Sequence, residues 1–178
     1  MAATNIFDPG TLTGFHTWLS IIAILAGVPV VAGLITSRST PLATGMFLVT
    51  AILTSATGYF FAFTGLKPSH IVGGIALVVL AVALIALRRL ARSGGPGAPV
   101  KGAGFWGRIY AGSMVASLFF LVFVAVAQAF AKVPALHALA PTQQEPPFAI
   151  AEGAALLVFV VLGFLAMRTH GRRAAVGA

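Results

Sequence analysis

Three histidines and one glutamate are the side chains of this sequence best suited to chemistry. His16, His70 and His137 lie at or near the ends of long apolar runs, and Glu152 lies inside one. Imidazole and carboxylate groups together bind transition-metal ions such as Zn, Cu, Fe or Mn. Two histidines on facing helices can instead hold a b-type haem for electron transfer. A third use of these groups is proton or quinol handling, with Glu152 as the carrier and a histidine as its partner.

The spacing of these residues limits how such a site could be built. No HExxH, HxxxH or HxH pattern occurs within a predicted helix, so the ligands of a metal ion would come from separate segments. The chain has no cysteine, which excludes disulfides, thiolate metal sites and haem attachment through thioethers. No motif identifies an enzyme or excludes one.

The composition indicates that membrane helices position these groups. Of the 178 residues, 59% are hydrophobic and 8% are charged, and the mean hydropathy is +1.02. Soluble domains carry about 25% charged residues, so we expect a lipid bilayer around this chain. A spanning helix needs roughly 20 residues to cross about 30 Å of hydrocarbon. Five segments meet this requirement: 16–36, 42–63, 70–87, 108–131 and 147–167.

The sequence therefore predicts an all-α integral membrane bundle of five transmembrane helices, forming one domain over residues 1–170. The Gly/Pro-rich stretch 93–104 is predicted to be a flexible cytoplasmic linker, and 171–178 a short basic cytoplasmic tail. No basic residue precedes the first apolar run, so we expect that run to remain as a helix rather than to be cleaved as a signal peptide.

The positive charges predict the orientation of the bundle, because cytoplasmic loops are enriched in lysine and arginine. Threading five helices places nine basic residues on one side and only Lys67 and Lys132 on the other. The nine are Arg38, Arg88, Arg89, Arg92, Lys101, Arg108, Arg168, Arg172 and Arg173. We therefore expect the N-terminus outside and the C-terminus in the cytoplasm. The net charge of +8 is accounted for by topology, so no nucleic-acid partner is expected.

The same threading gathers the polar chemistry on the outer side. All three acidic residues and three of the four histidines fall there. We expect a joint site at the outer ends of the helices, made of a first group of ligands and a second group around it. The first group is His16, His70, His137 and Glu152, and the second is Glu145, Gln128 and Ser20.

Glu152 is the sharpest single candidate, about one and a half turns inside the last predicted helix. A carboxylate in a spanning segment costs about 2.5–3.5 kcal/mol on insertion scales and usually faces the bundle. Ala149, Gly153 and Leu156 predict a closely packed face beside it. The alternative is that Glu152, only about 8 Å deep at 1.5 Å per residue, reaches back to the interface.

Small residues predict inward-facing positions for two of the histidines, because small side chains let membrane helices approach closely. They follow each histidine at helical spacing: Ser20, Ala23 and Gly27 after His16, and Gly74, Leu77 and Ala81 after His70. A single histidine at a helix start is more often an interfacial hydrogen-bonding group than a ligand, and that alternative stays open.

Three segments of the chain resemble a known group of proteins. "FHTWLSIIA", "KPSHIVGGIALVVLA" and especially "KVPALHALAPTQQEPPFAIAEG" are similar to segments of an uncharacterised family of small polytopic bacterial inner-membrane proteins. The resemblance implies a location in the bacterial inner membrane, and the similar segments contain His16, His70, His137, Glu145 and Glu152. In that membrane, the N-terminus that the charges place outside is expected to be periplasmic. It carries no assigned activity.

These observations lead to three functional hypotheses. The first is a periplasmic-side His/Glu site that binds a metal ion or haem for electron transfer. The second is a non-catalytic accessory or scaffold subunit that docks on a membrane-protein partner. The third is a small transporter or channel that works as a homo-oligomer and uses Glu152, since five helices are few for a transporter acting alone.

Overall fold

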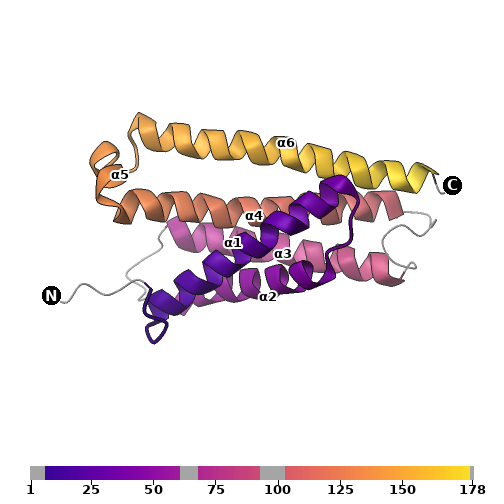
Figure 1. Cartoon of the computed structure of the whole chain (residues 1–178), viewed down its shortest axis with the longest axis horizontal. Helices are drawn as coiled ribbons and strands as arrows, with labels where there is room; N and C mark the ends of the chain where they lie inside the picture. Colours follow the sequence, from indigo (N-terminus) through magenta and orange to yellow (C-terminus); the bar gives the residue numbers. More distant parts are fainter. Residues whose placement is uncertain (1–6, 61–67, 93–102, 177–178) are drawn as a thin grey trace.

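The computed structural model describes residues 7–60, 68–92 and 103–176, and these are all-helical apart from short turns. Five helices are long and apolar enough to span a membrane, which confirms the expected number of spans. Figure 1 shows them as an antiparallel bundle, in which successive long helices run in opposite directions. The elements are α1 (Leu12–Thr36), α2 (Pro41–Thr57), the 3-10 helix η1 (Gly58–Phe60), α3 (Pro68–Arg92), α4 (Ala103–Lys132), α5 (Pro134–Leu139) and α6 (Pro146–Val176).

The two ends of the bundle differ in their polar residues. The start of α1, the short α5 and the start of α6 lie at one end, and the end of α6 lies at the other (Figure 1). We call the first the histidine end, because it carries His16, His70 and His137. We call the second the arginine end, because it carries the described arginines Arg38, Arg88, Arg89, Arg92, Arg108 and Arg168. The charge separation expected from threading is therefore present in the fold.

Helix α4 is the centre of the packing, with α3 and α6 along it and α1 across it. The crossing point is Gly27 of α1, where a Cβ atom would lie 2.6 Å from Leu118 Cδ1 and 3.0 Å from Phe47 Cε2. A side chain there would force Leu118 or Phe47 to move, so glycine allows α1 to pack closely against α2 and α4. Ala23 on the same face is fully buried, as the row of small residues after His16 predicts.

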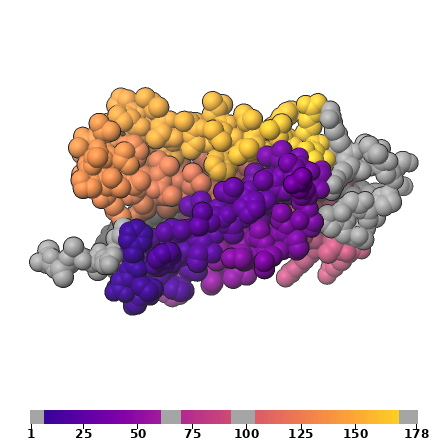
Figure 2. All heavy atoms as spheres, in the orientation of Figure 1, coloured from indigo at the N-terminus to yellow at the C-terminus, as the bar shows by residue number. Residues whose placement is uncertain are grey.

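The diagonal course of α1 leaves its two ends in different surroundings. Toward the arginine end α1 approaches α6, where the hydroxyl oxygen of Thr169 lies 3.2 Å from the carbonyl oxygen of Ile35 and 3.0 Å from that of Leu165 in its own helix. Toward the histidine end α1 diverges from α6 (Figure 1). The surface of α4 and α5 is visible between the two helices at that end in Figure 2. The histidine-end half of α6 thus rests on α4 without α1 beside it.

Several helix boundaries differ from those predicted. Helix α1 begins at Leu12 rather than at residue 16, because the Thr11 hydroxyl caps it by accepting from the Gly14 N–H at 3.0 Å. Helix α2 ends at Thr57 and continues as η1 to Phe60, and the remaining predicted residues 61–63 lie outside the described part of the chain.

Two segments predicted as linker and tail are in part helical. Residues 103 and 104 of the predicted linker belong to α4, whereas 93–102 lie outside the described residues. Helix α3 runs on to Arg92, and α6 runs on to Val176 through the predicted tail. Alanine, leucine and arginine are strong helix formers, so the helices continue past the apolar segments that defined the prediction.

The connection between α4 and α6 contains a helix that was not predicted. The six-residue helix α5 begins at Pro134, in the first helical turn where proline is tolerated. The loop after it turns at Gln143, whose φ of 58° lies in the left-handed region. This fold-back places the loop beside the end of α4.

Candidate functional site

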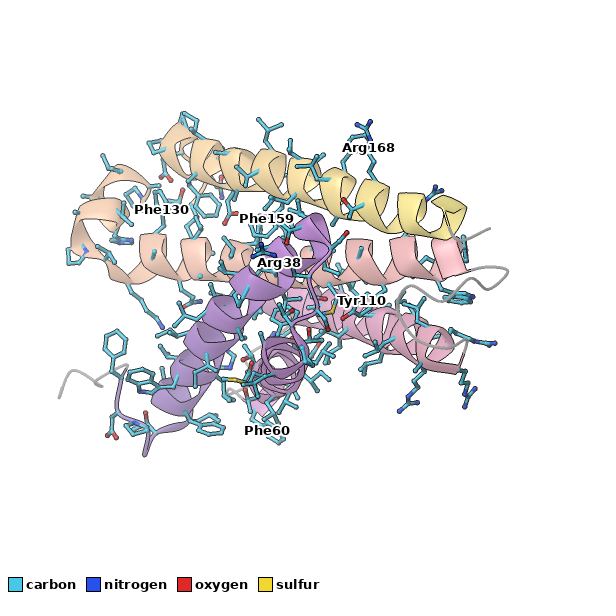
Figure 3. The ribbon with its side chains drawn as sticks, turned by 45° about the vertical axis from the view of Figure 1, so that its right-hand side comes forward. Arg38, Phe60, Tyr110, Phe130, Phe159 and Arg168 are labelled. Carbon is cyan, nitrogen blue, oxygen red and sulfur yellow. The ribbon has the colours of Figure 1, made fainter. Side chains whose placement is uncertain are left out.

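Glu152 lies on the face of α6 that packs against α4. One turn before it, the ring of Phe148 meets Phe130 of α4 with centroids 5.4 Å apart. Two turns after it, Phe159 meets Phe119 of α4 at 5.7 Å. Figure 3 shows Phe130 and Phe159 between the two helices. Because Glu152 shares this face and lies between the two aromatic contacts, its side chain is directed at the α4 segment around Phe123 and Ala127.

The carboxylate of Glu152 is buried without a hydrogen-bond partner. The residue is 9% exposed, and both carboxylate oxygens lack a donor among the described residues. The one other buried side-chain oxygen without a partner in that part of the chain is Thr54 Oγ1. A buried polar group without a hydrogen bond is costly, and a buried charge without a partner is much more so. Among the described residues, Glu152 thus has two buried oxygens without a hydrogen-bond partner, whereas Thr54 has one.

The prediction of a closely packed face of small residues beside Glu152 was wrong. Ala149, Gly153 and Leu156 are all exposed. The helix is turned so that Phe148, Phe159 and Ala166 face α4 instead. Since α6 is apolar around most of its circumference, hydrophobicity alone does not select a face. The aromatic rings of α4 and α6 do so by interdigitating.

A loop residue is hydrogen-bonded to the part of α4 that lies against Glu152. The side-chain amide of Gln143 donates to the carbonyl oxygen of Ala127 at 2.7 Å. Ala127 is in the part of α4 that faces Glu152. The loop between α5 and α6 is thus tied to α4 on the side of Glu152 that faces the histidine end.

Glu145 shapes this same loop instead of contributing to a ligand site. One carboxylate oxygen accepts from the hydroxyl of Thr142 at 2.9 Å and from its N–H at 3.2 Å, and the other accepts from the N–H of Gln144 at 3.0 Å. Its carbonyl accepts from Phe148 and Ala149 and starts α6. Desolvation raises the pKa of Glu145, but the hydrogen bonds outweigh it and hold the pKa below its usual value.

His16 is half-buried and bonded to α2. Its Nδ1 lies 3.0 Å from Oγ1 of Thr57. The Thr57 hydroxyl lies 2.7 Å from the carbonyl of Leu53 and donates its one proton within its own helix. When the Thr57 hydroxyl donates within its own helix, its oxygen can accept from an Nδ1–H of His16. The hydroxyl of Ser20 donates to the His16 carbonyl at 2.8 Å, so it bonds the main chain and not the imidazole.

His70 is buried at the start of α3, against η1. The Tyr59 hydroxyl donates to the carbonyl of His70 at 2.8 Å, and the two rings are 5.8 Å apart. The small-residue face predicted beyond His70 is only partly correct, because Leu77 is half-buried and Ala81 is exposed. The buried line runs instead through Ala76, Leu80, Ala83, Ala86 and Leu90.

His137 and Gln128 are both exposed, His137 on α5 and Gln128 near the end of α4. Among the described residues, no group of three or more histidine, aspartate or glutamate side chains could hold a metal ion. The expected convergence of His16, His70, His137 and Glu152 is therefore not realised there. His16 and His70 pack instead around the end of α2 and η1, and Glu152 lies in the separate seam between α4 and α6.

Three polar residues at these positions were not singled out for this role by sequence reasoning: Thr57, Tyr59 and Gln143. Thr50, Thr54 and Thr57 recur at helical spacing on α2, and this spacing was a signal for Thr57. For Gln143 the signal was the pair Gln143 and Gln144 in a loop between Pro141 and Pro146. This pattern does not predict the carbonyl to which the side-chain amide donates.

No protein-family model, no curated protein and no solved structure matches this chain.

Proposed function

We propose that this chain is a multi-pass membrane protein that takes up and releases a proton at Glu152, as the working group of a small oligomeric transporter or channel. The observation that carries the proposal is the burial of the Glu152 carboxylate between α4 and α6, with neither oxygen hydrogen-bonded to a described residue. An ionised carboxylate in such surroundings would be uncompensated, so the resting group is the neutral acid. Release of the proton requires a state in which water or a cation reaches the seam.

A metal or haem centre has less support. The two buried or half-buried histidines are engaged with α2 and η1, and His137 is exposed on α5. These positions do not present several ligands to one point. Proton binding needs only one carboxylate in an apolar seam, and Glu152 supplies it.

The reactivity of carbodiimides tests the protonation state. A hydrophobic carbodiimide reacts with a neutral acid in the bilayer: the acid proton moves to a carbodiimide nitrogen and the carboxyl oxygen bonds to the central carbon. An acyl shift then leaves a stable N-acylurea that carries the whole reagent mass. We expect labelling of Glu152 at neutral pH, located by peptide mass spectrometry, and its loss at alkaline pH. Glu145 is the internal control, because its carboxylate lies in the hydrogen-bonded loop and should react only with a water-soluble carbodiimide.

Proton flux into liposomes tests the function itself. Purified wild-type protein should dissipate a pH gradient, reported by an internal dye. Glu152→Gln should abolish the flux, and Glu145→Gln should retain it. The proposal is falsified if wild-type protein is not labelled at Glu152 near neutral pH, or if Glu152→Gln carries the same flux as wild type.

A second candidate, an accessory subunit of a larger membrane complex, is favoured by the exposure of α6. Only 6% of its apolar span is buried against the rest of the chain, compared with 44% for α1. Lipid or another protein must cover that surface. An accessory subunit predicts that the isolated chain carries no proton flux and that flux appears only in a defined complex.

A further inference from the structure

We propose that the seam between α4 and α6 at Glu152 binds a hydrophobic aromatic cation, which takes the place of the proton on the carboxyl group. This inference rests on the proposed function, because it names the substrate class of the same site: Glu152 holds either a proton or one such cation. The seam residues concerned are Phe119, Phe123 and Phe130 of α4 with Phe148, Glu152 and Phe159 of α6.

The charge of the site selects a cation. Neither oxygen of Glu152 has a hydrogen-bond partner among the described residues, and the residue is 9% exposed. An ionised carboxylate buried without compensation is costly, so the proton is exchanged only for another positive charge. When the cation binds, the O–H bond of the carboxyl breaks, the proton leaves to water and the carboxylate pairs with the cation. The seam therefore has no net charge in either state.

The helix packed against Glu152 brings no cationic side chain to that position. The two ring contacts between α4 and α6 place Glu152 close to Val126 of α4. Lys132, the exposed last residue of α4, lies six residues later, about 9 Å along the axis at 1.5 Å per residue. Arg108 and Tyr110 lie near the beginning of α4. A positive charge at the carboxylate must therefore come from a ligand.

Aromatic rings from both helices flank Glu152. Figure 3 shows Phe130 and Phe159 between α4 and α6. Phe123 lies on the same face of α4 between these two contacts, with its ring centroid 5.9 Å from that of Phe119. The face of a phenyl ring attracts cations, more strongly in a desolvated site than in water, and aromatic cages bind quaternary ammonium groups in this way. The carboxylate and the rings together suit a cation whose charge is spread over a large apolar surface.

A small inorganic cation fits the same seam poorly. Mg²⁺ and Ca²⁺ take about six to eight oxygen ligands, whereas the two oxygens of Glu152 are the buried unpartnered oxygens that the described part of the seam supplies. A small hydrated ion would lose its water without replacement. A phosphonium or quaternary ammonium ion with phenyl groups gains from burial of its apolar surface. The proposed ligand class is therefore the hydrophobic organic cation.

The packing of α6 allows such a cation to enter from the bilayer. Only 6% of the apolar span of α6 is buried, and its histidine-end half lies on α4 without α1 beside it (Figure 1). Toward the arginine end, Ala166 is fully buried, and the Thr169 hydroxyl oxygen lies 3.2 Å from the carbonyl oxygen of Ile35. The histidine-end half of α6 thus moves away from α4 more easily than the arginine-end half, which opens the seam at Glu152 toward lipid.

Equilibrium dialysis of tritiated tetraphenylphosphonium against the purified full chain in non-ionic detergent tests binding, with empty micelles as the blank. We expect saturable binding at neutral pH and release of about one proton per cation, reported by a pH dye in weak buffer. Triphenylphosphine oxide, which is neutral, and tetramethylammonium, which is small, should each compete about tenfold less well than unlabelled tetraphenylphosphonium. No binding above the blank, or equal competition by either compound, overturns the proposal.

A variant of the carboxyl group tests whether the cation pairs with Glu152. Glu152→Gln should weaken tetraphenylphosphonium binding by about tenfold or more and should release no proton, because its amide carries no charge. Wild-type affinity in this variant overturns the proposal.

Two phenylalanine substitutions test the contribution of the rings. Phe123→Leu keeps an apolar side chain without the ring and should weaken tetraphenylphosphonium binding by about three- to tenfold. Phe164→Leu is the matched control, because Phe164 is 59% exposed on a side of α6 turned away from α4, and it should leave binding unchanged. Equal binding by the two variants overturns the assignment of the cation to this seam.

Carbodiimide labelling of wild-type protein separates this inference from the proton role of Glu152 and needs no variant to fold. Tetraphenylphosphonium should protect Glu152 from the hydrophobic carbodiimide at neutral pH, because the paired carboxylate has no proton to transfer, and triphenylphosphine oxide should not. Equal labelling of Glu152 with and without tetraphenylphosphonium overturns the cation inference and leaves the proton role standing. Absence of labelling in both conditions overturns the proton role and the cation inference together.

Discussion

The side-chain amide of Gln143 donates a hydrogen bond of 2.7 Å to the carbonyl oxygen of Ala127, which fastens the α5–α6 loop to α4. Ala127 belongs to the stretch of α4 that faces Glu152, so this single bond lies between the buried carboxylate and the histidine end. The loop itself is ordered by Glu145, which accepts from Thr142 and Gln144.

Gln143→Met should open the route from water to Glu152. The substitution removes the donor to Ala127 while keeping the side-chain length. We expect a water-soluble carbodiimide, which leaves Glu152 unlabelled in wild type, to label it in this variant. Gln144→Met is the control, because that side chain is exposed and its main-chain N–H still donates to Glu145. Identical labelling in both variants would show that access does not pass this loop.

Thr57→Val should destabilise the protein by about 0.6–1.7 kcal/mol, the range for hydrogen bonds between membrane helices. The Thr57 hydroxyl is hydrogen-bonded to His16 Nδ1 across the α1–α2 contact at 3.0 Å, and valine removes that bond. Thr50→Val is the control, because the Thr50 hydroxyl donates to Met46 in its own helix at 2.6 Å. Unfolding in mixed micelles measures both. Equal losses for the two variants would remove the case for a helix–helix bond.

Acidification should loosen the loop at Glu145. Hydrogen bonds hold the pKa of this carboxyl below its usual value of 4.5, so their contribution is complete above that value. It is lost as the pH falls through the lower pKa of the folded state. Amide exchange at Thr142 and Gln144 should therefore accelerate only below pH 4.5, after correction for the intrinsic rate. Glu145→Gln should show the faster exchange at neutral pH, and protection equal to wild type there would contradict the assignment.

Gly27→Ala should cost about 1–3 kcal/mol, as expected for overpacking in a close-packed interior. Its new Cβ would lie 2.6 Å from Leu118 Cδ1 at the crossing of α1 and α4. Gly45→Ala is the matched control, since nothing lies within 4 Å of a Cβ there, and alanine favours a helix over glycine. We expect the control to be neutral or slightly stabilising. Equal stability of both variants would mean that the helices separate at Gly27 without cost.

The sequence predicts the architecture well because membrane spans leave a strong signal. Lengths of about 20 apolar residues, together with nine basic residues on one side, predict five antiparallel helices and the residues at each end. Boundaries are less well predicted, since a cap such as Thr11 or a run such as Arg88 to Arg92 extends a helix beyond its apolar part. The short α5 has too few residues for any periodicity to appear.

The candidate site was harder to predict, because it depends on the rotation of each helix about its axis. Glu152 was expected to face the bundle, and it does, but with Phe148 and Phe159 beside it and not Ala149 and Leu156. Because α6 is apolar on all sides, it has no single hydrophobic stripe that would predict which face packs against the bundle. His16 and Glu152 are toward the same end, yet α1 diverges from α6 there (Figure 1). Residues at one end of a bundle need not share one site.

Glu152→Met should make the protein more stable and leave it inactive. A buried carboxyl with no donor for either oxygen loses its hydration without compensation, at a typical cost of about 1–3 kcal/mol. Methionine fills a similar volume with apolar atoms and removes that cost. Replacing buried polar groups by well-packed apolar ones is often neutral or stabilising, so we expect a gain of up to about 3 kcal/mol in mixed-micelle unfolding.

Glu152→Met also distinguishes a functional role of the Glu152 carboxyl from a structural role. If Glu152 carries protons, Glu152→Met should raise stability and abolish proton flux together. A residue that lowers stability but is needed for activity is typical of a functional site. Ser117→Ala is a suitable control, since that buried hydroxyl donates to Ser113 in its own helix at 2.8 Å and should leave flux unchanged. A Glu152→Met protein that is less stable than wild type would show that the carboxyl is bonded in the native state, and the argument for a free acid in the α4–α6 seam would fail.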